Sequence, residues 1–354
     1  MSKELEIETT EETITEPAHI YYAEETESID SGKIPVWQQL TLLAVLMFLL
    51  LGGAITPKII AFFAEEKDSI PASVPTVETE GIQRDQIEPG TLGEPFSDIQ
   101  IQGAAAYVWD IQNQRALYKK NELESLPLAS VTKLMTALVA DELLSEEEGV
   151  AIDTESVKQY GNSGFLEGEV FGRLTLTDIT LMSSSNDGAY ALAAAAGDTL
   201  NPGKGATAFV HAMNVRANEL GLLNTSFKNP TGLDISETES GAEGSAKDMA
   251  FLMEYIVLNN PNILSFTTEE EVRVYSENGV YHDAENTNYY IDEIPGLIGS
   301  KTGYTDLAGG NLVVAFNAGL NRPIVISVLG STRQERFSDV IALVAASQQF
   351  VTQQ

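Results

Sequence analysis

The chain has 354 residues, no cysteine and a formal net charge of −32, from 52 acidic and 20 basic side chains. The lack of cysteine excludes cysteine nucleophiles, cysteine-based zinc sites and iron–sulfur clusters. The acidity argues against a nucleic-acid partner, because neutralising phosphates needs clustered Lys and Arg side chains. The histidines (His19, His211 and His282) show no HExxH-type pairing. We therefore expect no catalytic metal, and the sequence indicates no other cofactor.

Residues 1–33 are rich in Glu and Thr and contain few large apolar side chains. Such a segment cannot bury enough surface to offset its chain entropy, which predicts a disordered acidic tail. Residues 65–95 are rich in Pro, Glu and Thr without an apolar period. That composition is typical of a linker.

Residues 34–64 lie between these segments and contain a single charged side chain, Lys58. The apolar run is long enough to cross a bilayer, and a lysine near its end can extend its ammonium group to the interface. We expect a transmembrane signal anchor here. A buried core helix and a cleavable signal peptide are the alternatives, although the long acidic segment before the run is unlike the basic start of a signal peptide.

Residues 96–354 have the pattern of one folded domain. Extended runs predict a β-hairpin, GAAAYVWD–IQNQ–RALYKKN, and later strands, GLIGSKTG, GNLVVAFNAG and PIVISVLGS. Helical spacing predicts helices over 130–144, 176–198 and 206–222 and a final helix over 336–350. Early strands, a mostly helical middle and late strands imply a fold of the α/β class, built as an α+β sandwich. Its one sheet is built from both ends of the domain, with a helical insertion.

The first candidate for chemistry is the tetrad Ser130-Val131-Thr132-Lys133 at the start of a predicted helix. A spacing of three places the serine and the lysine on one helical face, with the hydroxyl at the positive end of the helix dipole. An unprotonated lysine there can act as a base, provided that its pKa falls by several units from about 10.4. Burial and a second nearby cation lower such a pKa. By itself, the tetrad equally fits an N-cap serine and a solvated lysine.

Further short motifs follow in the chain, Ser184–Asn186 and Lys301–Gly303. The hydroxyl and the amide of the first, on a loop between helices, can relay a proton and hold a substrate carbonyl. Alone it also fits an ordinary polar turn. The second lies on a predicted strand, where glycine lets a ligand approach the backbone and Lys and Thr present a cation and a hydroxyl. Its alternative is a strand that ends in a glycine turn.

The ordered motifs S-x-x-K, S-x-N and K-T-G resemble the signature of penicillin-binding proteins and serine β-lactamases. The longer context resembles the low-molecular-mass D-alanyl-D-alanine carboxypeptidases over residues 96–350. It includes ASVTKLMTALVA, GEVFGRLTLTDITLMSSSNDGAYALA, FVHAMNVRANELGLLNTSFKNPTGLD, SAKDMAFL and GLIGSKTGYTDLAGGNLVVAF. The resemblance implies a β-lactamase/transpeptidase-like fold with a mainly antiparallel sheet and helices on both faces. The middle motif reads SSN where SGN is common in the family.

The resemblance also implies catalytic roles. Ser130 would attack the D-Ala–D-Ala carbonyl, and Lys133 would take its proton. Ser184 would pass a proton to the departing D-alanine, while Asn186 would help to position the substrate and the lysine. Lys301 would lower the pKa of its neighbours.

Substrate binding is implied for the residues that follow Lys301. Thr302 would help Lys301 to bind the terminal carboxylate, beside Gly303, and the backbone N–H of Tyr304 would complete an oxyanion hole with that of Ser130. An arginine after the next strand would also meet the carboxylate. Arg333 and Arg336 are both candidates, and the R-F-x-D context favours Arg336.

We therefore expect residues 96–354 to be a serine D,D-peptidase domain. It would remove the terminal D-alanine from peptidoglycan stem peptides through a Ser130 acyl-enzyme, and β-lactams would inhibit it covalently. A D,D-endopeptidase that cuts cross-links remains an alternative, as does a catalytically silent wall-binding module. A class A β-lactamase fits poorly, because the chain has no E-x-x-L-N glutamate. Since peptidoglycan lies outside the cytoplasmic membrane, a single-pass protein with an extracytoplasmic domain is expected. We also expect residues 161–164, GNSG, to form a loop near the cleft.

Overall fold

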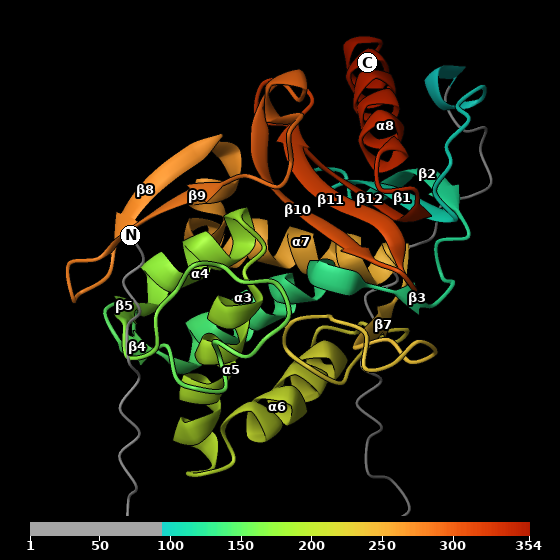
Figure 1. Ribbon diagram of the computed structural model, residues 1–354. Helices are drawn as coiled ribbons and strands as arrows, with labels where there is room; N and C mark the ends of the chain where they lie inside the picture. The colour runs from blue at the N-terminus through green and yellow to red at the C-terminus, as the bar shows by residue number, and fades with distance from the viewer. Residues whose placement is uncertain (1–93) are drawn as a thin grey trace, which may run out of the picture. The chain divides into compact units, whose positions relative to one another are not determined.

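The computed structural model describes residues 94–354. Their central element is an antiparallel sheet with the strand order β10-β11-β12-β1-β2 (Figure 1). The strands are β1 (Ala105–Asp110), β2 (Arg115–Lys120), β10 (Leu297–Thr305), β11 (Gly309–Asn317) and β12 (Pro323–Ser331). The early β1 pairs with the late β12, with Tyr107 opposite Ser327. The prediction of one sheet assembled from both ends of the domain is therefore confirmed.

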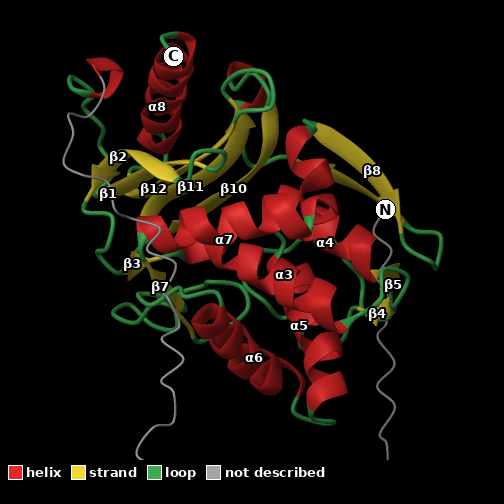
Figure 2. Cartoon of the chain, turned by 180° about the vertical axis from the view of Figure 1, so that it is seen from behind, coloured by secondary structure: helices red, strands yellow, loops and turns green. Residues whose placement is uncertain are grey.

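The sheet separates two hydrophobic cores because side chains alternate along each strand. In β1, Tyr107 and Trp109 point into one core, and Ala106 and Val108 point into the other. Helix α7 (Ala246–Asn259) packs against the first face, and α8 (Glu335–Thr352) packs against the second. Figure 1 and Figure 2 show these helices on opposite sides of the sheet. The expected helices on both faces are thus confirmed.

The helical insertion differs in detail from the prediction. The helical stretch predicted over 176–198 is two helices, α4 (Arg173–Met182) and α5 (Asn186–Leu200), with the start of the Ser184–Asn186 motif on the expected loop between them. The chain breaks because Ser184 has a left-handed φ of 62°, which no helix interior allows. Ser185 then caps α5 by accepting a hydrogen bond from the Gly188 N–H. The third predicted helix is α6 (Gly205–Glu219).

Ser130 lies in a 3₁₀ turn, η3 (Ala129–Thr132), and α3 (Lys133–Leu143) follows directly. The sequence had indicated a single helix from residue 130. The serine and the lysine nevertheless remain about one turn apart on the same face.

Several short elements escaped the sequence analysis. They are η2 (Glu94–Phe96), β3 (Leu126–Pro127), β4 (Gly149–Ala151), β5 (Val170–Gly172), β6 (Ser226–Phe227), β7 (Ala242–Gly244), η4 (Pro261–Thr268), β8 (Glu271–Tyr275), β9 (Tyr281–Glu285) and η5 (Ile291–Glu293). Strands this short carry too few residues to show an alternating pattern. Strands β8 and β9 form a separate two-stranded hairpin.

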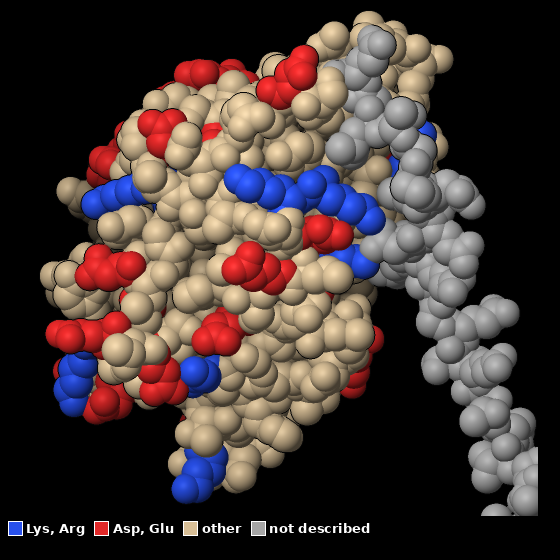
Figure 3. All heavy atoms as spheres, turned by 90° about the vertical axis from the view of Figure 1, so that its right-hand side faces the viewer, with Lys and Arg blue, Asp and Glu red and all other residues tan. Residues whose placement is uncertain are grey.

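The predicted acidic tail (1–33), signal anchor (34–64) and linker (65–95) fall outside the described residues, apart from the last two residues of the linker. Within 94–354, no helix combines the length and the apolar character that a membrane span requires. Acidic side chains lie scattered among neutral ones on the face shown in Figure 3.

The sheet holds the segment before Ser130 through a buried side chain of β11. The Asn311 Nδ2 donates to the carbonyl oxygens of Pro127 and Leu128, each at 2.9 Å. Its Oδ1 accepts a hydrogen bond from the Gly330 N–H at 2.8 Å. One amide thus ties the turn that carries Ser130 to two strands of the sheet.

Replacing Asn311 with alanine is expected to lower the free energy of unfolding by about 2–4 kcal/mol, because buried backbone groups lose their partners. Urea unfolding of the full chain measures this change. Asn317→Ala, at the partly exposed far end of the same strand, is the control. Equal stability of the two variants would contradict the role of the Asn311 amide.

Candidate active site

The site is built around the side chain of Lys133, which is fully buried. Its Nζ lies 2.8 Å from the Ser130 Oγ, 2.7 Å from the Asn186 Oδ1 and 2.9 Å from the Thr231 carbonyl oxygen. Burial penalises the ammonium form and lowers the pKa of Lys133 to about 7. Near neutral pH, a large share of this lysine is therefore the free amine.

The partners of Lys133 decide where its lone pair points. A neutral amine has two N–H groups and one lone pair. The Thr231 carbonyl and the Asn186 Oδ1 can only accept hydrogen bonds. The two N–H groups therefore point to these oxygens, and the lone pair is directed to the Ser130 hydroxyl. This arrangement lets Lys133 take a proton from Ser130.

The turn that carries Ser130 is held by close backbone packing. Ala129 has a left-handed φ of 48°, a conformation that costs free energy in a residue with a Cβ. A Cβ on Gly232 would lie 1.8 Å from the Ala129 carbonyl oxygen, so only glycine fits there. A Cβ on Gly303 would lie 2.9 Å from the Leu128 carbonyl oxygen and 3.2 Å from the Ser130 nitrogen. The glycine of K-T-G therefore makes room for the nucleophile turn, whereas the sequence had suggested only a ligand.

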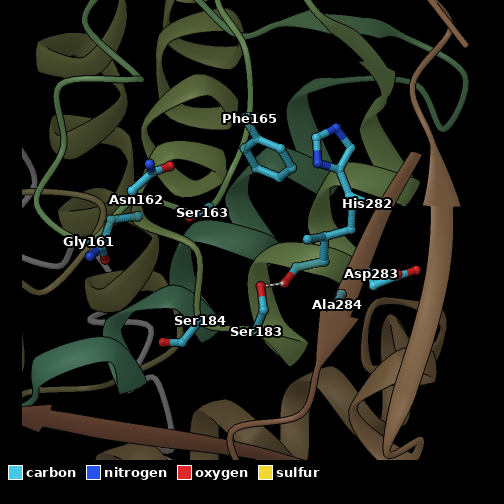
Figure 4. A pocket seen from close by; sticks show the side chains of 11 residues that line it. Gly161, Asn162, Ser163, Phe165, Ser183, Ser184, His282, Asp283 and Ala284 are labelled. Atoms are coloured by element: carbon cyan, nitrogen blue, oxygen red, sulfur yellow. Dashed lines mark hydrogen bonds between the residues drawn. The ribbon is translucent and has the colours of Figure 1, made fainter. Parts of the chain in front are cut away.

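Ser184, the residue with a left-handed backbone between α4 and α5, lines a pocket of about 300 Å³ together with Asn186. Figure 4 shows this pocket between the 161–165 loop and the β9 residues His282, Asp283 and Ala284. The loop around GNSG thus lies beside the site, as expected. The hydrogen bonds of the described residues do not connect the Ser184 hydroxyl to Ser130 or Lys133.

Lys301 and Thr302 are buried on β10, next to the nucleophile turn. The Lys301 Nζ donates to the Thr302 carbonyl oxygen at 2.9 Å. Burial, followed by the charges of Lys133 and Arg336, holds the pKa of Lys301 well below its ordinary value. The Thr302 Oγ1 lies 2.7 Å from the Thr287 Oγ1 in a shared hydrogen bond.

The structure separates the two arginine candidates. The buried Arg336 Nη1 donates to the Gly303 carbonyl oxygen at 2.6 Å, and burial lowers the pKa of its guanidinium to about 10. The Arg333 guanidinium instead lies 5.2 Å from the ring centre of Tyr304. Arg336 therefore contacts the backbone of the K-T-G motif, whereas Arg333 contacts the side chain of the residue that follows the motif on the same strand. Among the described residues, no carboxylate pairs with Lys133, and none pairs with Lys301 or Arg336, which are called the buried cations below.

The sequence analysis missed residues that act through the backbone or through distant contacts, namely Thr231, Thr287 and Asn311. Thr231 lies in NPTGLD, a stretch that resembled the family without showing what its residues do. Asn311 lies in the predicted strand GNLVVAFNAG, where the pattern did not show what its side chain would contact. Within the described part of the chain, no group of three or more His, Asp or Glu side chains is placed to hold a metal ion.

Comparison with known proteins now becomes informative. A model of the peptidase S11 family, D-alanyl-D-alanine carboxypeptidase, matches residues 92–333. The chain is 33% identical over 254 residues to D-alanyl-D-alanine carboxypeptidase DacF of Bacillus subtilis, covering 70% of this chain and 62% of DacF. It is 31% identical over 265 residues to a D-alanyl-D-alanine endopeptidase of Pseudomonas aeruginosa, covering 72% of this chain and 80% of that relative. The chain thus spans less than two thirds of the length of DacF.

Solved structures of the same kind share the fold. A D-alanyl-D-alanine carboxypeptidase from Mycobacterium tuberculosis gives a TM-score of 0.62 at 25% identity, covering 72% of this chain and 92% of that one. Penicillin-binding protein D2 from Listeria monocytogenes, in its ampicillin-bound form, gives 0.57 at 27% identity, covering 71% and 98%. The expected β-lactamase/transpeptidase-like fold is confirmed. On the family match and the identity to these relatives, the chain belongs to the D-alanyl-D-alanine carboxypeptidase family of serine peptidases.

Proposed function

We propose that this chain is a serine-type D-Ala-D-Ala carboxypeptidase that removes the terminal D-alanine from peptidoglycan stem pentapeptides. The observation that carries the proposal is the 2.8 Å approach of the Lys133 Nζ to the Ser130 Oγ inside a buried, cationic site. A buried amine with two acceptor partners is suited to activate a hydroxyl. A Ser–Lys pair on the surface is exposed to water, which keeps the lysine protonated near neutral pH.

In the acylation step, the Ser130 Oγ attacks the carbonyl carbon of the penultimate D-alanine while its proton moves to the Lys133 Nζ. The oxygen of that carbonyl becomes negative and would accept hydrogen bonds from the backbone N–H groups of Ser130 and Tyr304. The C–N bond then breaks, and the departing amine takes the proton from the Lys133 ammonium group through Ser184. Water next attacks the acyl carbon and gives a proton to the Lys133 amine. The ester C–O bond breaks, and Lys133 returns this proton to the Ser130 Oγ.

The buried cations explain why the enzyme would act next to the C-terminal carboxylate of its peptide substrate. Lys301 lies on the K-T-G strand beside the nucleophile turn, and Arg336 reaches the Gly303 carbonyl of that strand from α8. The described residues offer neither side chain a carboxylate. A substrate with a free carboxylate near the scissile bond supplies the missing negative charge. Thr302 adds a hydroxyl at the same place. This arrangement favours a scissile bond that lies next to a free carboxylate over an ordinary internal peptide bond.

Endopeptidase action on cross-links is the second candidate, because the relative from Pseudomonas aeruginosa is named an endopeptidase. A cross-linking D,D-bond also leaves a free carboxylate on the departing residue, so the buried cations would serve both reactions. The catalytically silent wall-binding module is disfavoured, since it has no need of the Ser130–Lys133 pair.

The proposal extends to location. Residues 34–64 would anchor the protein in the cytoplasmic membrane as a single-pass helix, with 1–33 on the cytoplasmic side. The linker 65–95 would hold domain 96–354 outside, where peptidoglycan lies. The composition of these segments supports this arrangement.

A fluorescent penicillin is expected to label the full-length chain covalently and to leave Ser130→Ala unlabelled, because only the serine hydroxyl can form the acyl bond. In intact cells, the label should sediment with the membranes. The wild type should also release D-alanine from a stem pentapeptide faster than it cuts cross-linked muropeptides. A folded wild type that takes no label would contradict the proposal, and faster cutting of cross-links would favour the endopeptidase.

The acylation rate is expected to fall about ten-fold for each pH unit below 7 and to level off above it, because protonated Lys133 has no lone pair. Second-order acylation rates between pH 5 and pH 9 test this, with circular dichroism as the control for folding. A rate that is flat across this range would contradict Lys133 as the base.

A further inference from the structure

A loop beside the active site contacts the SSN turn and the start of α5 through Tyr160 and Ser163. The Tyr160 carbonyl oxygen accepts a hydrogen bond from the Asn186 Nδ2 at 2.6 Å. The loop continues through 161–165 and forms one wall of the pocket that Ser184 also lines (Figure 4). A contact that holds this loop in place therefore also holds the groups around Asn186 in place.

Ser163, Ser185 and Asp187, called the latch below, join the loop to the SSN turn. The Ser185 Oγ donates to the Ser163 Oγ at 2.7 Å, and the Ser163 N–H donates to the Asp187 Oδ2 at 3.1 Å. Ser185 and Asp187 are almost fully buried. A glycine at position 185 could not make the first of these contacts. The latch is thus a feature of the serine that this chain has in the middle of its motif.

The loop determines which way the Asn186 amide faces. A backbone carbonyl can only accept, so the Tyr160 oxygen selects the Asn186 NH₂ group and leaves Oδ1 for Lys133. If the loop moved away, the amide could turn over and point its NH₂ at the Lys133 Nζ. That group would then donate to the amine lone pair, which would no longer face Ser130.

We propose that the latch is a positioning device for acylation. It holds the 160–165 loop against the SSN turn, so that Asn186 keeps its oxygen on Lys133 and the lone pair of Lys133 stays on Ser130. This inference rests on the proposed acyl-enzyme reaction. The residues of the latch act through Asn186 and are positioning residues.

Ser163 is the cleanest place to test the latch, because Ser185 also caps α5 by accepting from the Gly188 N–H. Losing that cap would lower stability by itself. Ser163→Ala removes the hydroxyl partner and leaves the cap in place. Ser156→Ala is the matched control, since the Ser156 hydroxyl bonds Asp153 within the same segment and does not touch the SSN turn.

Ser163→Ala is expected to acylate with a fluorescent penicillin about five-fold more slowly than the wild type, the loss that corresponds to one net hydrogen bond. The acid limb of its rate profile should also move to lower pH, because Lys133 loses an acceptor that favours its ammonium form. The charges of Lys301 and Arg336 are unchanged in this variant. Ser163→Thr, which keeps the hydroxyl, should restore both values, and Ser156→Ala should change neither.

Trypsin gives a readout that does not depend on activity. Lys158 is exposed at the start of the loop, and cleavage after it should accelerate in Ser163→Ala as the loop opens locally. Suppose that the wild type takes the label and that Ser163→Ala has the same acylation rate, the same acid limb and the same cleavage rate after Lys158 as the wild type. That result would overturn the latch and leave the acyl-enzyme proposal intact. If the wild type takes no label, the acyl-enzyme proposal fails, and unchanged cleavage after Lys158 then overturns the latch as well.

Discussion

The chemistry of this molecule depends on which atoms surround one buried amine. Lys133 has a pKa of about 7 because burial disfavours its charge. Low pKa alone would not make it a useful base. The Thr231 carbonyl and the Asn186 Oδ1 occupy its N–H groups, and this leaves the lone pair for the Ser130 hydroxyl. These partners come from separate parts of the chain, and the fold brings them together around the Lys133 Nζ.

Close backbone packing achieves this assembly at some cost in conformational free energy. Ala129 and Ser184 adopt left-handed conformations although both have a Cβ. Gly232 and Gly303 lie so near the nucleophile turn that a side chain on either would collide with it. The buried cations add an electrostatic cost that no carboxylate of the described residues offsets. Strain and unpaired charge of this kind are typical of sites that gain their missing partner from a substrate.

The sequence predicted the sheet well, because β1, β11 and β12 are largely apolar runs that are buried on both faces. Motif order predicted Ser130, Lys133 and Asn186, whose side chains meet at the Lys133 Nζ. It could not identify Thr231, which contributes a carbonyl that any residue possesses. The loop at Ser184 was expected, but its left-handed backbone was not, because a left-handed serine leaves no mark in the apolar pattern. Only the structure separates Arg336 from Arg333, since both lie in the same short segment.

An NMR titration of ¹³C-labelled lysine in the full chain tests the central claim most directly. The Lys133 Cε signal can be assigned by its loss in Lys133→Gln. The account predicts a midpoint near pH 7 for this signal. A midpoint close to the ordinary lysine value of about 10.4 would show that Lys133 stays protonated at neutral pH, and that it cannot serve as the base for Ser130.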